Sequence, residues 1–205
     1  MAVAEVTAFV RANLPATPAR VLEIGAGKGE LAYALSDAGY DVVAIDPEPA
    51  GANVRACALH ELDEPRASFD AAVAVVSLHH VDPLADSLRR LAEVLKPSGV
   101  LLVDEFDVHA FDRRSAEWWL EQRRALGVDE QHTADELVEE HRTHLHPLET
   151  ITQALEPHFH VNAPLRMPYL YRWDLGESFR RLEEGLIARG QLTAVGARFL
   201  AYRRT

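Results

Sequence analysis

A run of alternating glycines carries the clearest chemical signal in the sequence. Glu23 precedes Gly25, Gly27 and Gly29; the run follows an apolar segment and opens a segment of helical composition. Glycines allow a tight turn and leave backbone amides open to close approach by a ligand. Asp46 ends the next apolar segment, where a carboxylate can accept hydrogen bonds from both hydroxyls of a ribose. Together these residues predict a nucleoside-binding site rather than a plain strand-to-helix turn.

Two common phosphate-binding loops do not fit this run. The dinucleotide fingerprint places its third glycine at position 30, and Glu30 would put a negative charge beside a pyrophosphate, which disfavours an NAD-dependent oxidoreductase. A Walker loop needs Ser or Thr after its lysine, but Gly29 follows Lys28, and Leu22 replaces the first glycine. A cofactor with a ribose and no phosphate fits better.

Histidines and carboxylates gather where two further apolar segments end. His79 and His80 follow the segment 71–76, and Asp104 and Glu105 end the next one. In open α/β sheets, ligands bind at the carboxyl edge of the strands. An imidazole there can take a proton from an acceptor, and a carboxylate can contact the acceptor. Either histidine could instead serve only in packing, and one of the two carboxylates could instead cap a loop.

The elements that must position these residues alternate along the first hundred residues. Strands are expected at 21–24, 41–45, 71–76 and 100–103, and helices at 30–38 and about 82–95. Strands this apolar are buried on both faces, which implies a parallel sheet covered by helices. The link 47–52 is too short for a usual crossover helix. Either an irregular loop makes this crossing, or 53–59 is not a regular strand.

The second half is more polar. Residues 107–146 have helical composition, and Thr133 and Glu136 have the spacing of a capping box. Helices are expected at 148–155 and 179–187, an extended stretch broken by Pro164 and Pro168 at 159–173, and a last strand at 194–202. The prediction is a single domain, 1–205, with a helical insertion at about 107–146 that forms a mobile lid over the acceptor.

Other side chains in this half carry weaker signals. The spacing of His141, His144 and His146 would allow metal ligation, but no Cys or Asp cluster supports it, so we expect no metal. The run 135–140 is expected to be a solvated helix face. Several aromatic residues could wall an aromatic or quaternary-ammonium pocket, or serve as core: Trp118, Trp119, Tyr169, Tyr171 and Trp173.

The amino-acid composition limits the kinds of molecule that this protein is expected to bind. The 205 residues include 21 basic and 32 acidic side chains, a net charge of −11, which disfavours nucleic acid and anionic membranes. No apolar stretch approaches the roughly 20 residues that span a bilayer, and no secretory signal is evident. The single Cys57 fits a reducing compartment. We expect a cytoplasmic protein acting on a neutral or cationic small molecule, although Arg166 and Arg172 could receive a carboxylate.

Four segments resemble the successive motifs of class I S-adenosylmethionine-dependent methyltransferases. They are VLEIGAGKGELA, VVAIDPEP, FDAAVAVVSLHHV and LAEVLKPSGVLLVDEF, within residues 20–106. The resemblance implies a Rossmann-like three-layer α/β sandwich with a seven-stranded, mostly parallel sheet whose last strand is antiparallel. It also implies S-adenosylmethionine as cofactor and methyl transfer to a small molecule. A sensor or scaffold protein that binds this cofactor without turnover is the alternative.

The resemblance also implies roles for single residues around the cofactor. Glu23 would orient the methionine ammonium, and Asp46 would hold the ribose. Ala58 departs from the family, which often has Asp there for the adenine amino group. Either Glu61 or a backbone carbonyl would substitute, or adenine would be held mainly by stacking. The remaining cofactor contacts would be Gly25, Gly27, Gly29, Leu59 and Ser77.

For catalysis, the resemblance points first to His80. It matches a histidine that takes part in catalysis in phosphobase-methylating relatives. His79 and Glu105 are the further catalytic candidates.

Overall fold

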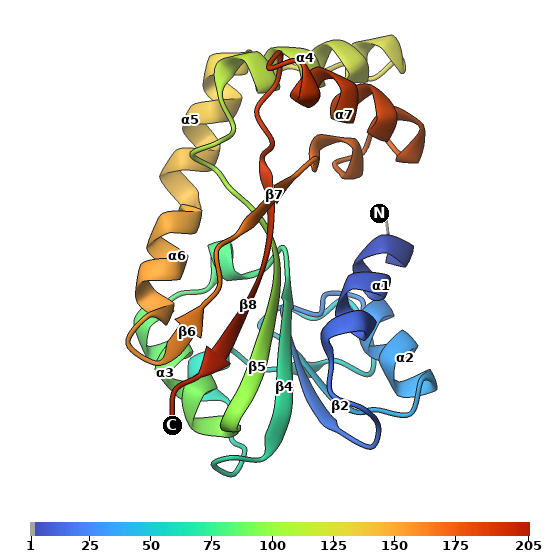
Figure 1. Cartoon of the computed structure of the whole chain (residues 1–205). Coiled ribbons are helices and arrows are strands. Elements are labelled where there is room, and N and C mark those ends of the chain that lie inside the picture. The colour runs from blue at the N-terminus through green and yellow to red at the C-terminus, as the bar shows by residue number, and fades with distance from the viewer. Residues whose placement is uncertain (1–2) are drawn as a thin grey trace.

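The computed structural model describes residues 3–205 and contains one mixed sheet flanked by helices (Figure 1). The strand order is β3-β2-β1-β4-β5-β8-β6, and β7 also pairs with β8. Strands β1 to β5 are parallel to their neighbours, while β8 is antiparallel to β5, which confirms the predicted fold class. The strands of this series are β1 (Arg20–Ile24), β2 (Asp41–Asp46), β3 (Arg55–Ala56), β4 (Phe69–Val75), β5 (Leu95–Phe106) and β8 (Gly196–Arg203).

The described sheet has eight strands rather than seven because one position is divided. Both β6 (Phe159–Val161) and β7 (Leu165–Met167) pair antiparallel with β8, one after the other along its edge. Pro164 lies between them and has no N–H to donate to a ladder. The predicted extended stretch therefore forms two short strands in the place of one.

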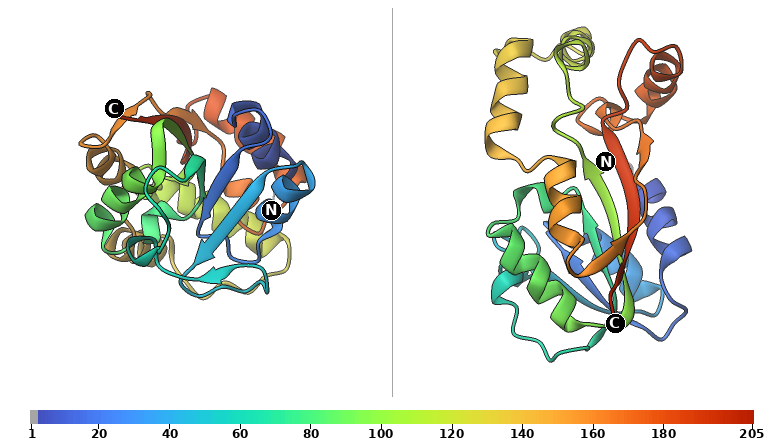
Figure 2. Two further views of the ribbon diagram at one scale, coloured as in Figure 1. Left: turned by 90° about the horizontal axis from the view of Figure 1, so that it is seen from below. Right: turned by 60° about the vertical axis from the view of Figure 1, so that its left-hand side comes forward.

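Helices cover both faces of this sheet (Figure 2). On one face lie α1 (Val3–Asn13) and α2 (Glu30–Asp37); on the other lie α3 (Leu84–Val94) and α6 (Leu148–Leu155). Neighbouring strand residues point to opposite faces, so Val21 packs with α1 and α2 whereas Leu22 packs with α3 and α6. Each helix in this part of the chain is too short or too polar to cross a membrane.

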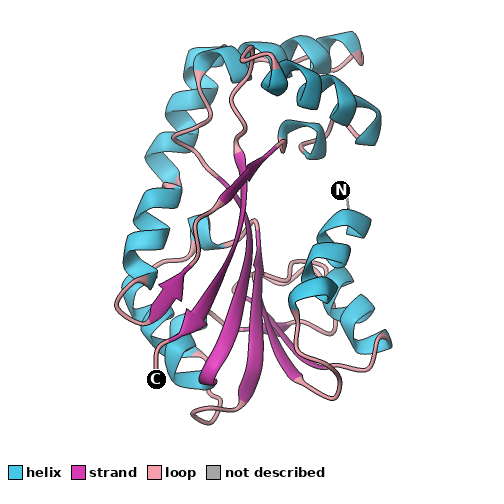
Figure 3. Ribbon diagram, in the orientation of Figure 1, coloured by secondary structure: helices cyan, strands magenta, loops and turns pink. Residues whose placement is uncertain are grey.

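A group of helices stands beyond the carboxyl ends of the strands (Figure 3). It consists of α4 (Arg113–Ala125), α5 (Ala134–His144) and α7 (Arg180–Ala188). Apolar side chains of α4, α5 and the segments beside them, among them Phe111, Trp119 and Leu137, form a core distinct from the two beside the sheet. The predicted capping box begins α5: Glu136 N donates to Thr133 Oγ1 at 3.3 Å, and Thr133 N donates to Glu136 Oε2 at 2.8 Å.

The crossing from β2 to β3 contains no helix among residues 47–54. Strand β3 has two residues, and a single 3-10 turn follows at Leu59–Glu61, so most of 53–59 is not strand. The irregular loop packs directly on the glycine run: Ala50 N donates to Gly27 O at 3.0 Å, and a Cβ on Gly51 would lie 2.3 Å from Lys28 O.

Candidate active site

The glycine run forms the predicted turn between β1 and α2. Gly25, Gly27 and Gly29 have φ values of 69°, 52° and 76°, in the region that favours glycine. A Cβ on Gly25 would lie 2.3 Å from Ser77 Cβ, so this approach requires glycine. Ser77 Oγ donates to Ile24 O at 2.9 Å and fixes the turn to the end of β4.

Asp46 holds this turn from the neighbouring strand. Its Oδ2 accepts from Gly27 N at 2.9 Å, and its Oδ1 accepts from Glu48 N at 2.9 Å. Each carboxylate oxygen keeps a second lone pair. The side chain lines a cavity of about 510 Å³, here named the Asp46 cavity, together with Ala58, Leu59, Ser77 and His80. Asp46 can therefore accept two further hydrogen bonds from a molecule in this cavity.

Glu23 lines a second cavity of about 670 Å³, here named the Glu23 cavity, which also includes Val6 and Lys28. The Glu23 side chain is 5% exposed, and its buried Oε2 has no hydrogen-bond partner within residues 3–205. Burial raises the pKa of Glu23 to about 7, against a lowering contribution from the backbone N–H of Ala32. A buried carboxylate oxygen without a partner suits a bound ammonium group, which would satisfy it.

A third cavity of about 350 Å³, here named the aromatic cavity, lies between the ends of β4 and β5 and helix α5. Its lining includes Val76, His80, Phe106, His141, Tyr169 and Trp173. Val76 lines all three cavities, and His80 lines both the Asp46 cavity and the aromatic cavity. The three cavities therefore meet at the turn that follows β4.

The backbone at this junction is strained. Val76 has φ 51°, an unfavourable value for a β-branched residue that costs on the order of 1–3 kcal/mol. Its N–H donates to Asp104 O at 2.7 Å, which ties the turn to β5. Strain of this kind persists only where the surroundings fix it.

Glu105 and His79 form a buried pair beneath this junction. Glu105 is fully buried and accepts from Leu78 N and Phe106 N, each at 2.9 Å. It also accepts from His79 Nδ1 in a short hydrogen bond. The Glu105 carboxylate therefore lies behind His79 and lines none of the three cavities.

His80 is the exposed member of this group. Its ring lies 4.2 Å from the His79 ring, centroid to centroid. Partial burial, with His79 and His141 nearby, lowers the pKa of His80 against the opposing effect of Glu105. The ring is therefore neutral near pH 7, and its nitrogens have no hydrogen-bond partner in the described part of the chain. The structure brings the three predicted catalytic residues together, and His80 is the one with a free ring between two cavities.

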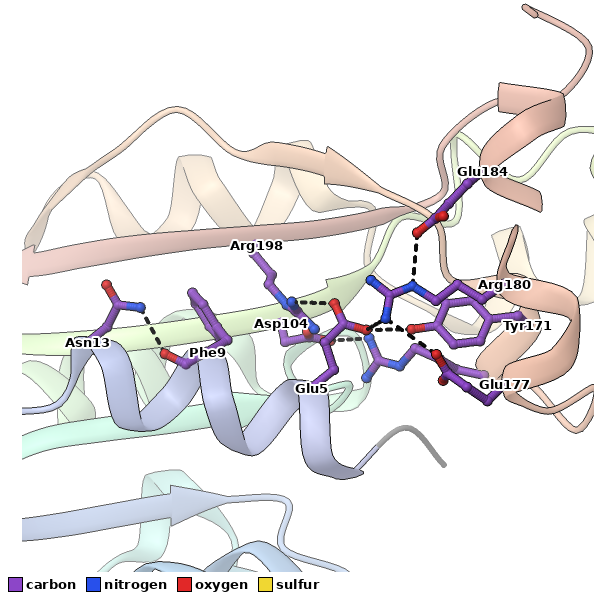
Figure 4. A network of polar contacts seen from close by, with 10 residues as sticks. Glu5, Phe9, Asn13, Asp104, Tyr171, Glu177, Arg180, Glu184 and Arg198 are labelled. Carbon is purple, nitrogen blue, oxygen red and sulfur yellow. Dashed lines mark hydrogen bonds and ion pairs between the residues drawn. The ribbon is translucent and has the colours of Figure 1, made fainter. Parts of the chain in front are cut away.

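Asp104 lies at the same strand end but faces guanidinium groups. Arg172 Nη1 donates to it at 2.7 Å, and Arg198 Nε donates in a short bond. Arg198 also reaches Glu5 Oε1 at 2.8 Å, and Tyr171 Oη donates to Glu5 Oε2 at 2.6 Å (Figure 4). This network extends from α1 to the segment before α7 and holds Arg172 through Nη1, whereas the buried Nε of Arg172 has no hydrogen-bond partner within residues 3–205.

Arg166, the other residue expected to receive a carboxylate, also pairs with a carboxylate of the protein itself, because its Nη1 lies 2.6 Å from Asp107 Oδ2. Neither Arg166 nor Arg172 lines the aromatic cavity.

The structure places the aromatic and histidine residues of the second half in different environments. Of the five aromatic candidates, Tyr169 and Trp173 line the aromatic cavity, Trp119 and Tyr171 are buried in the core, and Trp118 is partly buried against the helical core. His141 and His144 each direct Nδ1 at a backbone carbonyl four residues earlier. Among residues 3–205, no three His, Cys, Asp or Glu side chains are arranged to hold a metal.

Sequence reasoning did not single out Phe106 or Val76 as site residues. Both are apolar residues at strand ends, so their side chains carry no chemical signal. The position at the carboxyl edge of the sheet was the only available indication.

The sequence matches the family described as "Methyltransferase domain" over residues 2–157. Over 98 residues it is 39% identical to an uncharacterized methyltransferase of Mycobacterium tuberculosis (strain ATCC 25618 / H37Rv). That alignment covers 43% of this chain and 40% of the other protein, so the chain spans about two fifths of this curated relative's length.

Solved structures share the fold at low sequence identity. One is the 1,6-didemethyltoxoflavin-N1-methyltransferase of Burkholderia thailandensis with bound S-adenosylhomocysteine, at TM-score 0.58 and 21% identity, covering 99% of this chain and 78% of that one. Another is the 4+2 cyclase SpnF, at TM-score 0.60 and 15% identity, covering 98% and 80%. The two names show that this fold serves more than one reaction. Because the family match extends over more than half of the sequence, the chain belongs to the methyltransferase-domain family.

Proposed function

We propose that this protein transfers the methyl group of S-adenosylmethionine to a small-molecule acceptor. The observation that carries the proposal is the meeting of three cavities at Val76, two of which His80 also lines. Two of the three cavities contain a carboxylate suited to one part of the cofactor, Asp46 in one and Glu23 in the other. Asp46 would hold the ribose hydroxyls, and Leu59 would lie against the adenine. Glu23 Oε2 would accept from the methionine ammonium. The bound cofactor would supply a methyl group activated by a positive sulfur.

In this proposal His80 is the general base. Its neutral ring lies where the cofactor and acceptor cavities join, so it can take a proton from a hydroxyl or amine as the methyl group is transferred. His79 and Glu105 are positioning residues. A carboxylate can only accept, so the Glu105 contact places the His79 proton on Nδ1 and fixes the ring on which His80 rests.

The cofactor assignment is tested by calorimetry with S-adenosylhomocysteine and, separately, NAD. We expect binding of S-adenosylhomocysteine and none of NAD. Asp46→Ala should weaken binding by at least about 10-fold, since a hydrogen bond to a charged group contributes about 1.5–3 kcal/mol. Asp37→Ala, at the exposed end of α2, is the matched control and should bind normally. Unchanged affinity in a folded Asp46→Ala variant would remove Asp46 from the ribose site.

Turnover separates the enzyme from a cofactor-binding sensor. Once an acceptor is found, His80→Ala should lower the rate by about 10²–10⁴-fold, the range for a lost general base, with cofactor affinity little changed. A normal rate in this variant would reduce His80 to a packing role. Cofactor binding without S-adenosylhomocysteine release for any acceptor would favour the sensor.

A further inference from the structure

One wall of the aromatic cavity consists of aromatic rings that pack against one another. Phe106 lies 5.2 Å from Tyr169 and 6.0 Å from Trp173, centroid to centroid, and His141 lies 4.9 Å from Trp173. Trp119 stacks behind Trp173 at 4.5 Å with a 27° interplanar angle, so the wall is supported by the helical core. A wall of this kind binds flat apolar rings through stacking and edge contacts.

The cavity has no basic side chain other than imidazole in its lining. The guanidinium of Arg172 lies 4.9 Å from the Tyr169 ring and donates to Asp104 through Nη1. The one carboxylate in the lining, Glu140, is exposed on α5. The polar groups that line the aromatic cavity are therefore suited to a neutral hydrogen-bonding acceptor molecule rather than to one that carries a carboxylate.

Tyr169 lines this cavity and carries a hydroxyl that can donate a hydrogen bond. Its ring is fixed between Phe106 and Arg172, and its backbone N–H donates to Glu183 Oε1 at 2.8 Å. The hydroxyl makes no hydrogen bond within the part of the chain that the structure describes. Burial raises the pKa of Tyr169, so the phenol keeps its proton and can donate. His80, in the same lining, supplies the complementary acceptor.

From this arrangement we infer that Tyr169 is a specificity-determining residue that donates a hydrogen bond to a planar aromatic acceptor carrying a hydroxyl and a neighbouring oxygen. This inference rests on the proposed methyl transfer. The ring lies against the Phe106 wall, the neighbouring oxygen accepts from Tyr169 Oη, and the hydroxyl faces His80. The hydroxyl oxygen forms a bond to the methyl carbon, and the carbon–sulfur bond breaks with its electron pair passing to sulfur. The hydroxyl proton passes to His80.

The test uses catechol as probe, with cyclohexane-1,2-diol and 2-(dimethylamino)ethanol as comparisons. Cyclohexane-1,2-diol keeps both oxygens but is not planar, and 2-(dimethylamino)ethanol represents a cationic acceptor. Binding is measured by calorimetry with S-adenosylhomocysteine present, and turnover by S-adenosylhomocysteine release from S-adenosylmethionine. We expect catechol to bind and turn over, and each comparison compound to bind at least about 10-fold more weakly.

Tyr169→Phe tests the hydroxyl alone, because it keeps the ring and its stacking. It should weaken catechol binding and raise KM by about 3- to 10-fold, with S-adenosylhomocysteine affinity unchanged. Tyr202→Phe, on an exposed tyrosine of β8, is the matched control and should match the wild type. Equal catechol binding by the Tyr169→Phe and Tyr202→Phe variants would overturn the role of Tyr169.

Failure of the inference differs from failure of the proposed function. If S-adenosylhomocysteine binds but catechol does not, or if either comparison compound binds as well as catechol, the acceptor class is wrong and the methyltransferase assignment stands. If S-adenosylhomocysteine itself does not bind, the proposed function fails.

Discussion

Glu23 is a buried carboxyl group whose charge should depend on what occupies its cavity. Its pKa is raised to about 7 by burial, and its Oε2 has no partner among residues 3–205. A raised carboxyl pKa stabilises the folded protein at low pH, and this contribution is lost as the pH rises from 4.5 through about 7. A bound ammonium reverses the preference because it favours the ionised carboxylate.

We therefore predict that S-adenosylhomocysteine affinity falls as the pH falls through 7. Between pH 8 and pH 6 the affinity should drop by up to about 10-fold, since Glu23 must lose a proton to bind the ammonium. Glu23→Gln should weaken binding at pH 8 and remove this pH dependence. Calorimetry at both pH values tests it, with Glu30→Gln, an exposed carboxylate at the same cavity, as control. An unchanged pH profile in the Glu23→Gln variant would contradict the prediction.

The sequence identified polar residues of the candidate site better than apolar ones. Glu23, Asp46 and His80 could be singled out because their chemistry is specific and strand ends converge at one edge. The free ring of His80 and the burial of Glu105 could not be predicted from the sequence. Residues near the ends of adjacent strands differ in exposure only because of tertiary packing.

The segment 169–171 is held by a single side chain of another element. Glu183, buried on α7, accepts from Tyr169 N at 2.8 Å, Leu170 N at 3.0 Å and Tyr171 N at 2.8 Å. These three N–H groups lie at the start of a 3-10 turn and have no intrahelical partner there. Glu183 thus links the position of α7 to that of the Tyr169 ring.

Glu183→Gln should lower the free energy of unfolding by about 1–3 kcal/mol. The glutamine amide has only one acceptor oxygen, so its NH₂ group would face a backbone N–H in the place of one carboxylate oxygen. Urea denaturation measures the change. Glu184→Gln, the exposed neighbour that pairs with Arg180, is the control and should change stability by less than about 0.5 kcal/mol. Equal stabilities of the two variants would show that the segment is held by other contacts.

Residues 107–146 are predicted to act as a mobile lid. Helices α4 and α5 pack on a core distinct from the two that lie beside the sheet, and α5 contributes Glu140, His141 and His144 to the lining of the aromatic cavity. We expect amide hydrogen exchange in α5 to slow when S-adenosylhomocysteine and catechol bind together, with α3 unchanged as the internal reference. Equal protection with and without ligands would make this segment a fixed part of the fold.

Element positions were predictable where the pattern was local. The capping box at Thr133 and the helix at 148–155 follow from residues within one or two turns. The division of the extended stretch 159–173 into β6 and β7 could not be predicted, and neither could the two-residue length of β3. Both depend on how distant segments pair in the sheet.

Across the whole molecule, one charge network joins distant parts of the chain. Glu5 on α1 meets Arg198 of β8 and the Tyr171 hydroxyl, and Arg180 approaches it at 3.2 Å. Burial alone would raise the pKa of Glu5, but Tyr171 and Arg198 outweigh it and lower the pKa. A lowered carboxyl pKa stabilises the fold above pH 4.5, and this contribution is lost as the pH falls through the folded-state value.

Glu5→Gln should therefore lower the free energy of unfolding by about 1–3 kcal/mol at pH 7. The difference should shrink as the pH falls from 4.5 through the lowered folded-state pKa, below which the wild type also loses the charge. Thermal unfolding across this pH range tests it. Glu177→Gln, whose exposed carboxylate contacts Arg180 at 3.3 Å, should change stability by less than about 0.5 kcal/mol. A Glu5→Gln effect that stays constant with pH would show that the carboxylate's charge is not involved.

The position of β8 has a consequence for how the chain is made. β8 lies inside the sheet, between β5 and the pair β6 and β7, although it follows all three in the chain. During synthesis, the outer edge of β5 stays unpaired until residues 196–202 leave the ribosome, and β6 and β7 have no strand to join. An unpaired apolar edge is open to pairing with other chains. The nascent protein is thus open to aggregation until β8 emerges, and a ribosome stalled before β8 is complete would leave a product that cannot complete this sheet.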